Sequence, residues 1–287
     1  MKKCTIVTNG YCDYQSVKDQ VFELKFELEE RGVSVKTAYT RELLTYVAEG
    51  GEAESKLYGN DFIVYLDKDP YLSHLLEKCG YKLVNSAKAI EICDDKMKTH
   101  VALSGVVRMP ATISSPLAYE PQKDDAFIDY VETVIPYPVV VKEVFGSMGR
   151  GVYLCPDKAS LIKKRAELTG KPHLYQRFIG KGGEDVRVIV IGGKAVAAMK
   201  RRNDVDFRSN VAAGGRGTNI ELTDEDRTLA ETAAKTLALD YCGVDILHED
   251  GKSYLCEVNS NAFWSGISKV TSINVAAMYA QYLVDKY

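Results

Sequence analysis

The sequence lacks the features of several large classes of protein. No apolar run in its 287 residues approaches the length of about 20 that a membrane-spanning helix needs, and the opening MKKCTIVTNG turns polar too early for a secretory signal. The net charge of −3 gives no basic excess with which to grip nucleic acid. We therefore expect neither a membrane nor a nucleic acid as a partner.

Cysteine and histidine do not occur in the patterns that usually carry chemistry. The seven cysteines are an odd number, form no C-x-x-C pair and lie mostly within apolar runs. This predicts free, buried thiols in a reducing compartment. None of the four histidines lies in a recognisable motif. We expect a cytoplasmic protein whose chemistry depends on other side chains.

The first third of the chain alternates strand and helix patterns. Val17, Val21, Leu24 and Leu28 recur at helical spacing after a β-rich run at 4 to 10. Further apolar runs at 33 to 39, 61 to 67 and 81 to 86 alternate with a helical stretch at 70 to 80. The alternation predicts a parallel α/β lobe over residues 1 to 85. One helix from 86 to 105 is expected to follow it.

The pattern changes after a Pro-containing, polar connection at about 114 to 138. Gly192-Gly193 and the 249 to 251 segment predict two hairpins, and Thr223 followed by three acidic residues predicts the start of a helix that runs to about 239. A last helix is expected at about 272 to 287. We predict a second unit over 86 to 287, with a central lobe at about 110 to 180 and a C-terminal lobe at about 181 to 287.

Three oxygen donors are predicted near the second hairpin. Glu257 and Asn259 are two residues apart, so the period of a strand puts both on one face. A three-residue turn at 249 to 251 would place Asp245 opposite Leu255 and on that same face, whereas a two-residue turn would send it to the other face. Carboxylate and amide oxygens suit Mg²⁺. The plainer alternative is a set of solvated hairpin residues.

Two basic patterns precede this hairpin. In PVVVKEVFGSMGRGV, Lys142 leaves a buried strand just before Gly146, Gly149 and Gly151, whose backbone could approach a phosphate. In KRRNDVDFRSN, Arg208 lies close to a run of three cations that would repel one another unless an anion is bound. Each pattern alone is equally typical of an ordinary turn or a solvated loop.

Together, in this order, these segments resemble the ATP-grasp superfamily, and specifically its RimK-like branch of α-L-glutamate ligases. The resemblance is carried from about residue 80 to 287 by CDDKMKTH, PVVVKEVFGSMGRGV, LYQRFI, EDVRVIVIGGKAVAAMKRRNDVDFRSN, LDYCGVDIL and CEVNSN. It implies an ATP-grasp fold, in which an N-terminal parallel α/β lobe is followed along the chain by two α+β lobes that hold a nucleotide between them.

The resemblance also implies roles for individual residues. Lys96 and Lys142 would contact nucleotide phosphates, and Asp185 would hold the ribose. The adenine would be lined by Gln176, Arg177 and Phe178, and the terminal phosphates would face Arg208, Ser209 and Asn210. Asp245, Glu257 and Asn259 would be the metal ligands, Lys142 and Arg208 would act in catalysis, and Arg202 and Asn261 would contact substrate.

The implied reaction is an ATP-dependent ligation of a carboxylate to an amine through an acylphosphate. The implied cofactors are ATP and Mg²⁺, as two ions, with Mn²⁺ as an alternative. Glutamate is the favoured amine, the acceptor is a carboxylate of a peptide, protein or small metabolite, and a homo-oligomer is compatible with this function. The alternatives are another amino acid or amine, or a nucleotide-binding regulatory protein without catalysis. Relatives usually carry Glu in place of Arg177, and they differ around Ala262 to Ser268, where Trp264 is expected either in the core or in a substrate wall.

Overall fold

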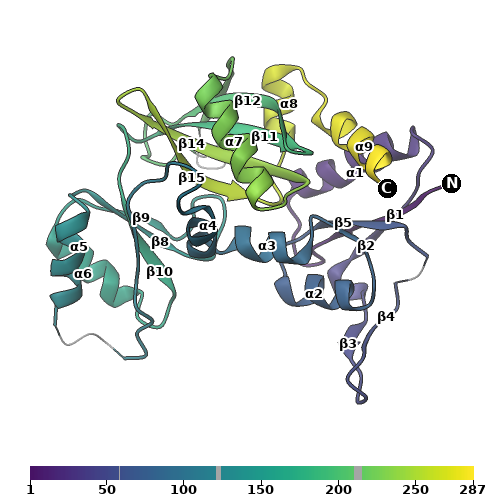
Figure 1. The fold of residues 1–287 in the computed structure, drawn as a ribbon, viewed down its shortest axis with the longest axis horizontal. Helices are drawn as coiled ribbons and strands as arrows, with labels where there is room; N and C mark the ends of the chain where they lie inside the picture. The colour runs from purple at the N-terminus through teal and green to yellow at the C-terminus, as the bar shows by residue number, and fades with distance from the viewer. Residues whose placement is uncertain (58, 121–123, 210–214) are drawn as a thin grey trace.

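The computed structural model describes residues 1–57, 59–120, 124–209 and 215–287 of the chain. Its main sheets form three groups with the helices that cover them, and the groups follow one another along the chain (Figure 1). Among the described residues, no helix is both long enough and apolar enough to cross a bilayer.

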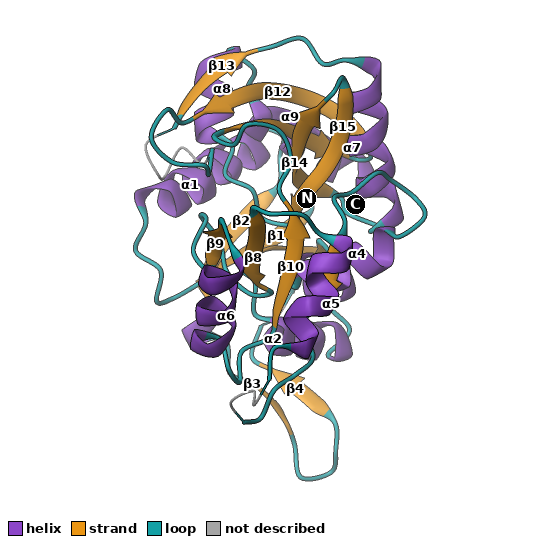
Figure 2. Ribbon diagram, turned by 90° about the vertical axis from the view of Figure 1, so that its left-hand side faces the viewer, coloured by secondary structure: helices purple, strands orange, loops and turns teal. Residues whose placement is uncertain are grey.

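The first group is a parallel sheet of four strands in the order β2-β1-β5-β6. Its strands are β1 (Lys3–Thr8), β2 (Ser34–Tyr39), β5 (Phe62–Leu66) and β6 (Leu83–Val84), with helices α1 (Gln15–Glu29) and α2 (Pro70–Lys78). The predicted strand and helix alternation is confirmed. A short 3-10 turn, η1 (Thr40–Glu42), and a hairpin of β3 (Thr45–Val47) and β4 (Ala53–Ser55) were not expected, because this polar segment lacks an apolar alternation. The hairpin projects from the body in both views (Figures 1 and 2).

Two short helices occupy the segment expected to form one long helix. Helix α3 (Ala87–Asp94) ends at Asp95, whose φ of −105° and ψ of 108° are not helical, and α4 (Lys96–Leu103) begins directly after it. The carboxylate of Asp95 accepts hydrogen bonds from the backbone N–H groups of Met97 and Lys98. Asp95 is therefore the N-cap of a second helix, and the prediction of a single helix was wrong.

The second group is an antiparallel sheet in the order β7-β10-β8-β9. It contains β7 (Thr112–Ser114), β8 (Val139–Glu143), β9 (Val152–Cys155) and β10 (His173–Arg177), with α5 (Ala126–Val134) and α6 (Lys158–Glu167) packed on it. Strand β7 ends where the predicted connection begins, at Ser114, whereas helix α5 lies inside that connection. Ile128 and Val131 of α5 are fully buried and lie three residues apart, so an apolar pattern at helical spacing marks this helix in the sequence.

The third group is an antiparallel sheet in the order β13-β12-β11-β14-β15. Its strands are β11 (Glu184–Ile191), β12 (Lys194–Arg202), β13 (Arg216–Asn219), β14 (Tyr241–Glu249) and β15 (Lys252–Asn259). Both predicted hairpins are present, with two-residue turns at Gly192-Gly193 and Asp250-Gly251. All four turn residues have positive φ, as primed turns require.

Each face of this third sheet packs against a different set of elements. Helix α7 (Asp224–Thr236), capped by Thr223 as predicted, covers the face that carries Val186, Val188 and Val244. The other face joins α8 (Ser265–Thr271), α9 (Val275–Lys286), α1 and the parallel sheet in one continuous hydrophobic core. Trp264 is 1% exposed within that core, so the core alternative is confirmed for this side chain.

All seven cysteines are free thiols, as the sequence predicted. Four of them are buried, whereas Cys12, Cys79 and Cys256 are partly exposed.

Candidate active site

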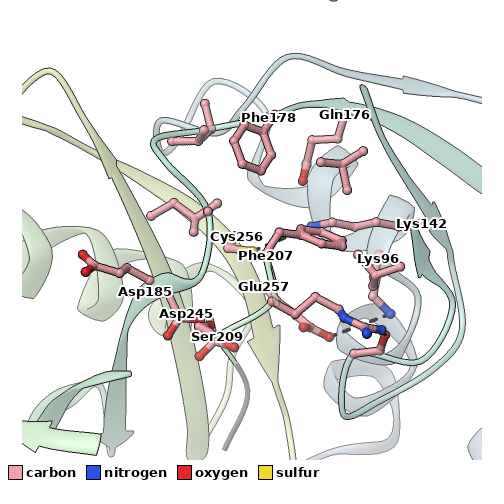
Figure 3. Close-up of a pocket in the computed structure, with 18 of the residues that line it drawn as sticks. Lys96, Lys142, Gln176, Phe178, Asp185, Phe207, Ser209, Asp245, Cys256 and Glu257 are labelled. Atoms are coloured by element: carbon pink, nitrogen blue, oxygen red, sulfur yellow. Dashed lines mark hydrogen bonds and ion pairs between the residues drawn. The ribbon is translucent and has the colours of Figure 1, made fainter. Parts of the chain in front are cut away.

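A cleft between the second and third sheets collects most of the residues that the sequence singles out. It encloses about 790 Å³, counting the part that is open to solvent. Gln176 and Phe178 lie at one end, and Lys96 and Glu257 meet at the other (Figure 3). The predicted residues that line the cleft are Lys96, Lys142, Gln176, Arg177, Phe178, Asp185, Arg208, Ser209, Asp245 and Glu257.

The hairpin of β14 and β15 brings Asp245 and Glu257 opposite each other. The turn has two residues, so Glu249 pairs with Lys252 and the two-residue alternative is the one present. Asp245 nevertheless stays on the cleft face, because a bulge next to Ile246 adds one residue to β15 and shifts the register. Leu255 and Val258 are both buried under α7, so the two residues between them, Cys256 and Glu257, belong to the cleft side.

Asp245 is buried within a network of arginines. Its carboxylate accepts from Arg187 of β11 at Nε and at Nη2, the latter at 2.7 Å, and lies 2.9 Å from Nη2 of Arg201 on β12. Arg201 also forms a two-pronged ion pair with Asp185. Burial opposes the ionisation of Asp245, but the two guanidinium groups outweigh it and lower the pKa of Asp245. The carboxylate therefore stays charged at neutral pH.

The basic run at 200 to 202 does not depend on a bound anion for its neutralisation, which corrects the expectation from the sequence. Lys200 pairs with Glu184 at 2.7 Å, and the exposed Arg202 pairs with Asp204 and Glu184. Together with the pair of Arg201 and Asp185, the chain supplies its own counter-charges.

Two buried lysines reach the Glu257 end of the cleft from different elements. Lys96, the first residue of α4, donates from Nζ to the carbonyl of Gly146 at 3.0 Å and lies 3.8 Å from Oε1 of Glu257. Lys142 leaves β8 beside it, with its Nζ 3.7 Å from Sγ of Cys256. Burial lowers the pKa of Lys96, an effect that Glu257 partly offsets. An anion placed between the two lysines would offset the cost of burying their charges.

The other end of the cleft offers an apolar slot with polar groups at its edge. The amide nitrogen of Gln176 is held by His100 and by Thr112 Oγ1, each at 2.9 Å. Arg177 points its guanidinium to Glu249 at 2.6 Å. The walls include Val140, Val152, Phe178, Ile179, Phe207 and Leu247. A planar base fits between such walls.

The segment expected to face the terminal phosphates is only partly described. Arg208 is bound by Asp206, with Nη2 2.6 Å from Oδ2, and donates from Nη1 to the carbonyl of Gly149 at 2.9 Å. Arg208 therefore connects this segment to the glycine-rich loop. Ser209 is buried beside it. Asn210 lies outside the described residues.

Three predicted residues are not among those that line the cleft. Asn259 lies opposite Gly243 at the end of β15, and its Nδ2 is buried with no hydrogen-bond partner among the described residues. Arg202 is largely exposed and is the last residue of β12. Asn261 is contacted by Gln20 of α1 through a long hydrogen bond of 3.4 Å.

The residues present fit a Mg²⁺ ion. Asp245 and Glu257 supply two carboxylates on adjacent strands, and Asn259, two residues after Glu257 on β15, would add its amide oxygen. No group of three or more His, Cys, Asp or Glu in the described part of the chain could hold a metal ion alone. The amide and phosphate oxygens are therefore needed to complete the set, as is usual for Mg²⁺.

The sequence did not single out several residues that shape the cleft. Arg187 holds Asp245, and Cys256, the extra residue of the bulge, lies next to Lys142. Val140 and Leu247 face the cleft because each is two residues from a predicted site residue on the same strand, Lys142 or Asp245. That two-residue period is the signal that could have found them.

The arrangement of the sheets and cleft defines a known class of fold. The structure of the ATP-grasp ligase PsnB, solved in complex with a phosphomimetic variant of its minimal precursor, Mg and ADP, matches this chain with a TM-score of 0.70. The two are 17% identical in sequence, and the match covers 100% of this chain and 99% of PsnB. The fold is an ATP-grasp fold, as predicted.

Comparison of the sequence identifies the family within this class. The RimK-like ATP-grasp domain matches residues 93–283. A relative from Mycoplasma genitalium, "Uncharacterized protein MG012", is 31% identical over 284 residues, which cover 96% of this chain and 98% of that protein. The "Probable alpha-L-glutamate ligase" of Maridesulfovibrio salexigens is 36% identical over 213 residues, covering 72% of this chain and 68% of its own. The chain belongs to the RimK-like ATP-grasp family.

Proposed function

We propose that the protein is an ATP-dependent, ADP-forming ligase that joins glutamate to a carboxylate of a peptide, protein or small metabolite. The observation that carries the proposal is a cleft lined by Lys96, Lys142, Asp245 and Glu257, with Lys96 Nζ 3.8 Å from Glu257, and with an apolar slot at its other end. Membership of the RimK-like family and the name of the glutamate-ligase relative support the reaction class and the amine.

The chemistry requires that several anions be held together. The acceptor carboxylate attacks the γ-phosphorus of ATP, forming an acylphosphate and breaking the bond to the β-phosphate, so that ADP leaves. The amine then attacks the acyl carbon, and inorganic phosphate and a proton are released as the amide forms. Lys96 and Lys142 would bind phosphate oxygens, and Arg208 would bring its charge in from the glycine-rich loop.

A divalent cation would be held by Asp245, Glu257 and Asn259. When bound, Mg²⁺ supplies positive charge that neutralises the phosphate oxygens during transfer. Arg187 and Arg201 fix the position of Asp245 and keep it ionised, so the ligand is preorganised. The apolar walls around Phe178 and Leu247 would exclude water from the bound nucleotide, next to which the acylphosphate forms.

A second candidate is a nucleotide-binding regulatory protein without catalysis. One observation favours it: both oxygens of Asp245 already accept bonds from guanidinium groups. Another amino acid or amine in place of glutamate is a variant of the first proposal.

The first test is a screen of amino acids against carboxylic acids for ADP formation, with the product identified by its mass. A pair that yields ADP and a product heavier by one amino acid residue would support the ligase. Binding of ATP with Mg²⁺ but no ADP from any pair would favour the regulatory candidate.

The matched variants for this screen are Glu257→Ala and Glu221→Ala. Glu257 is a partly exposed ligand candidate at the end of β15, and Glu221 is an exposed carboxylate outside the cleft. We expect Glu257→Ala to lower the rate of ADP formation by about 10²-fold or more without lowering the melting temperature, and Glu221→Ala to do neither. Full ligation by Glu257→Ala would overturn the assignment.

A further inference from the structure

A second cavity lies beside the nucleotide cleft, between α2, the α3 and α4 pair, and the start of the glycine-rich loop. We call it the α2 groove; among its lining residues are Lys68, Tyr71, Lys78, Asp94, Lys98 and Phe145. It encloses about 1100 Å³, counting the part that is open to solvent. Phe145 lines the groove while the next residue, Gly146, lines the cleft, so one loop separates the two spaces.

The inner end of the α2 groove adjoins the reacting end of the cleft. Lys68 follows β5 and donates from Nζ to Asp94 Oδ1 at 2.8 Å, and the same oxygen accepts a long bond of 3.5 Å from Ser260, which follows β15. Ser260 is three residues beyond Glu257, which lines the cleft, so this contact joins the inner end of the groove to the cleft. The second oxygen of Asp94 is buried with no hydrogen-bond partner among the described residues.

The position of Lys68 agrees with a general rule for open parallel sheets. The chain leaves β1 toward β2 on one side and β5 on the other, so the strand order reverses between β1 and β5. Ligands bind outside the carboxyl ends of the strands at such a point. Asn9 and Asp67, which follow these two strands, are hydrogen-bonded to each other there, and Lys68 is the next residue.

The groove favours an anionic ligand. Lys68, Lys78 and Lys98 oppose Asp94 and Glu91, so cations exceed carboxylates by one with histidine neutral. Lys98 pairs with Glu91 at 2.6 Å, but both side chains are more than a third exposed, and such a pair is weak enough to exchange with a ligand. Lys78, at the end of α2, has no salt bridge among the described residues.

The length of the groove indicates how large this ligand is. Tyr71, His74, Leu75 and Lys78 recur at intervals of three or four along one face of α2. The eight steps from Pro70 to Lys78 correspond to roughly 12 Å of helix. An extended peptide covers this distance with about three or four residues, whereas a free amino acid at Lys68 would not reach Lys78. Tyr71 and Phe145 are 81% and 61% exposed and offer apolar surface along the way.

We propose that the α2 groove binds the acceptor, and that the acceptor is the end of an acidic peptide three or four residues long. The reacting carboxylate lies at Lys68, next to the Glu257 end of the cleft, and a carboxylate of an earlier residue lies at Lys78. This inference rests on the proposed ligase function. It assigns Lys78 as a residue that selects the acceptor without taking part in the chemistry.

The test uses N-acetylated oligomers of one to five glutamates as acceptors, with glutamate and Mg²⁺-ATP. We expect the KM for the acceptor to fall with length up to three or four residues and then to level off, with little change in kcat. Lys78→Gln should raise the KM of the tetramer about threefold, and by no more than about fivefold, but leave that of the monomer unchanged. The matched control is Lys88→Gln, because Lys88 is an exposed lysine of α3 that does not line the groove.

A binding measurement separates this inference from the proposed function. Fluorescein-labelled tetraglutamate is titrated with the protein in the presence of Mg²⁺ and a non-hydrolysable ATP analogue, so turnover is not needed. Weaker binding by Lys78→Gln but not by Lys88→Gln supports the groove even if no ADP forms, in which case only the ligase proposal fails. ADP formation without any dependence on acceptor length, or equal behaviour of the two variants, overturns the groove and leaves the ligase in place.

Discussion

The walls of the cleft between the second and third sheets and the walls of the α2 groove both carry many charges, but most of these charges differ in how deeply they are buried. Asp185 and Asp245 share Arg201 with side-chain exposures of 5%, whereas the outer ion pair of the groove, Lys98 with Glu91, is 38 to 49% exposed, and only its inner pair, Lys68 with Asp94, is partly buried. A buried pair cannot exchange its partner for water, so its geometry is fixed. An exposed pair can, so it can release a lysine to a ligand. The difference teaches that the cleft is built to position groups and the groove to accept them.

Replacing one cation by methionine in each region tests this difference in burial most directly. Arg201→Met would leave the carboxylates of Asp185 and Asp245 without one of their cations in a buried site, and we expect a loss of about 3–5 kcal/mol in the free energy of unfolding. Lys98→Met removes an exposed cation, and we expect a loss within about 1 kcal/mol. Urea denaturation of the two variants and the parent measures both. Similar losses would show that burial does not distinguish the two regions.

Close packing around Gly243, behind the cleft, allows a second test with a smaller expected loss of stability. A Cβ added at Gly243 would lie 2.5 Å from Cβ of Ala262 and 3.2 Å from Cδ of Arg187, so the strand, the following loop and the arginine that holds Asp245 would have to move. We expect Gly243→Ala to cost about 1–3 kcal/mol of unfolding free energy and to weaken Mg²⁺-dependent nucleotide binding. Denaturation and nucleotide titration would detect these losses.

Gly266 in α8 is the control for this substitution. A Cβ there meets no atom within 4 Å, and the residue is helical. Gly266→Ala should therefore stabilise the protein by about 0.4–1 kcal/mol. If both alanines had the same effect, the spacing behind Asp245 would not be critical.

Strand periods and glycine turns are local signals, so the sequence predicted the main sheets, and the family resemblance added most of the predicted site residues that line the cleft. Leu247 was not singled out, although it lies two residues after Asp245 on the same strand face. What the sequence could not predict depends on partners far along the chain. The bulge that keeps Asp245 opposite Glu257, the capture of Arg201 by two aspartates, and the opposition of α2 to Phe145 all join segments separated by many residues. The α2 groove has no motif, since its three lysines come from two helices and a loop.

A half-exposed pair lies between these extremes and should give the smallest effect. His248 Nε2 lies 2.8 Å from Asp226 Oδ1 under α7, with the histidine side chain 41% exposed. The hydrogen bond to Asp226 raises the pKa of His248 above its usual 6.5, although burial opposes this. Because the folded state holds this proton more tightly than the unfolded state does, the stabilisation is complete below about pH 6.5 and is lost as pH rises through the raised pKa.

The Asp226 side of this pair does not disturb the measurement. Burial would raise the pKa of Asp226, but its bonds from His248 and Ser253 lower it, so its contribution is constant above pH 5. Buried His100 and His173 have lowered pKa values and act with the opposite sign. The difference between the parent and His248→Gln is therefore the quantity to measure. We expect it to shrink by less than about 1 kcal/mol between pH 5.5 and 8.5, with the NMR titration of His248 centred above pH 6.5. A difference that grows with pH would mean that Asp226 binds the neutral ring in preference to the charged one.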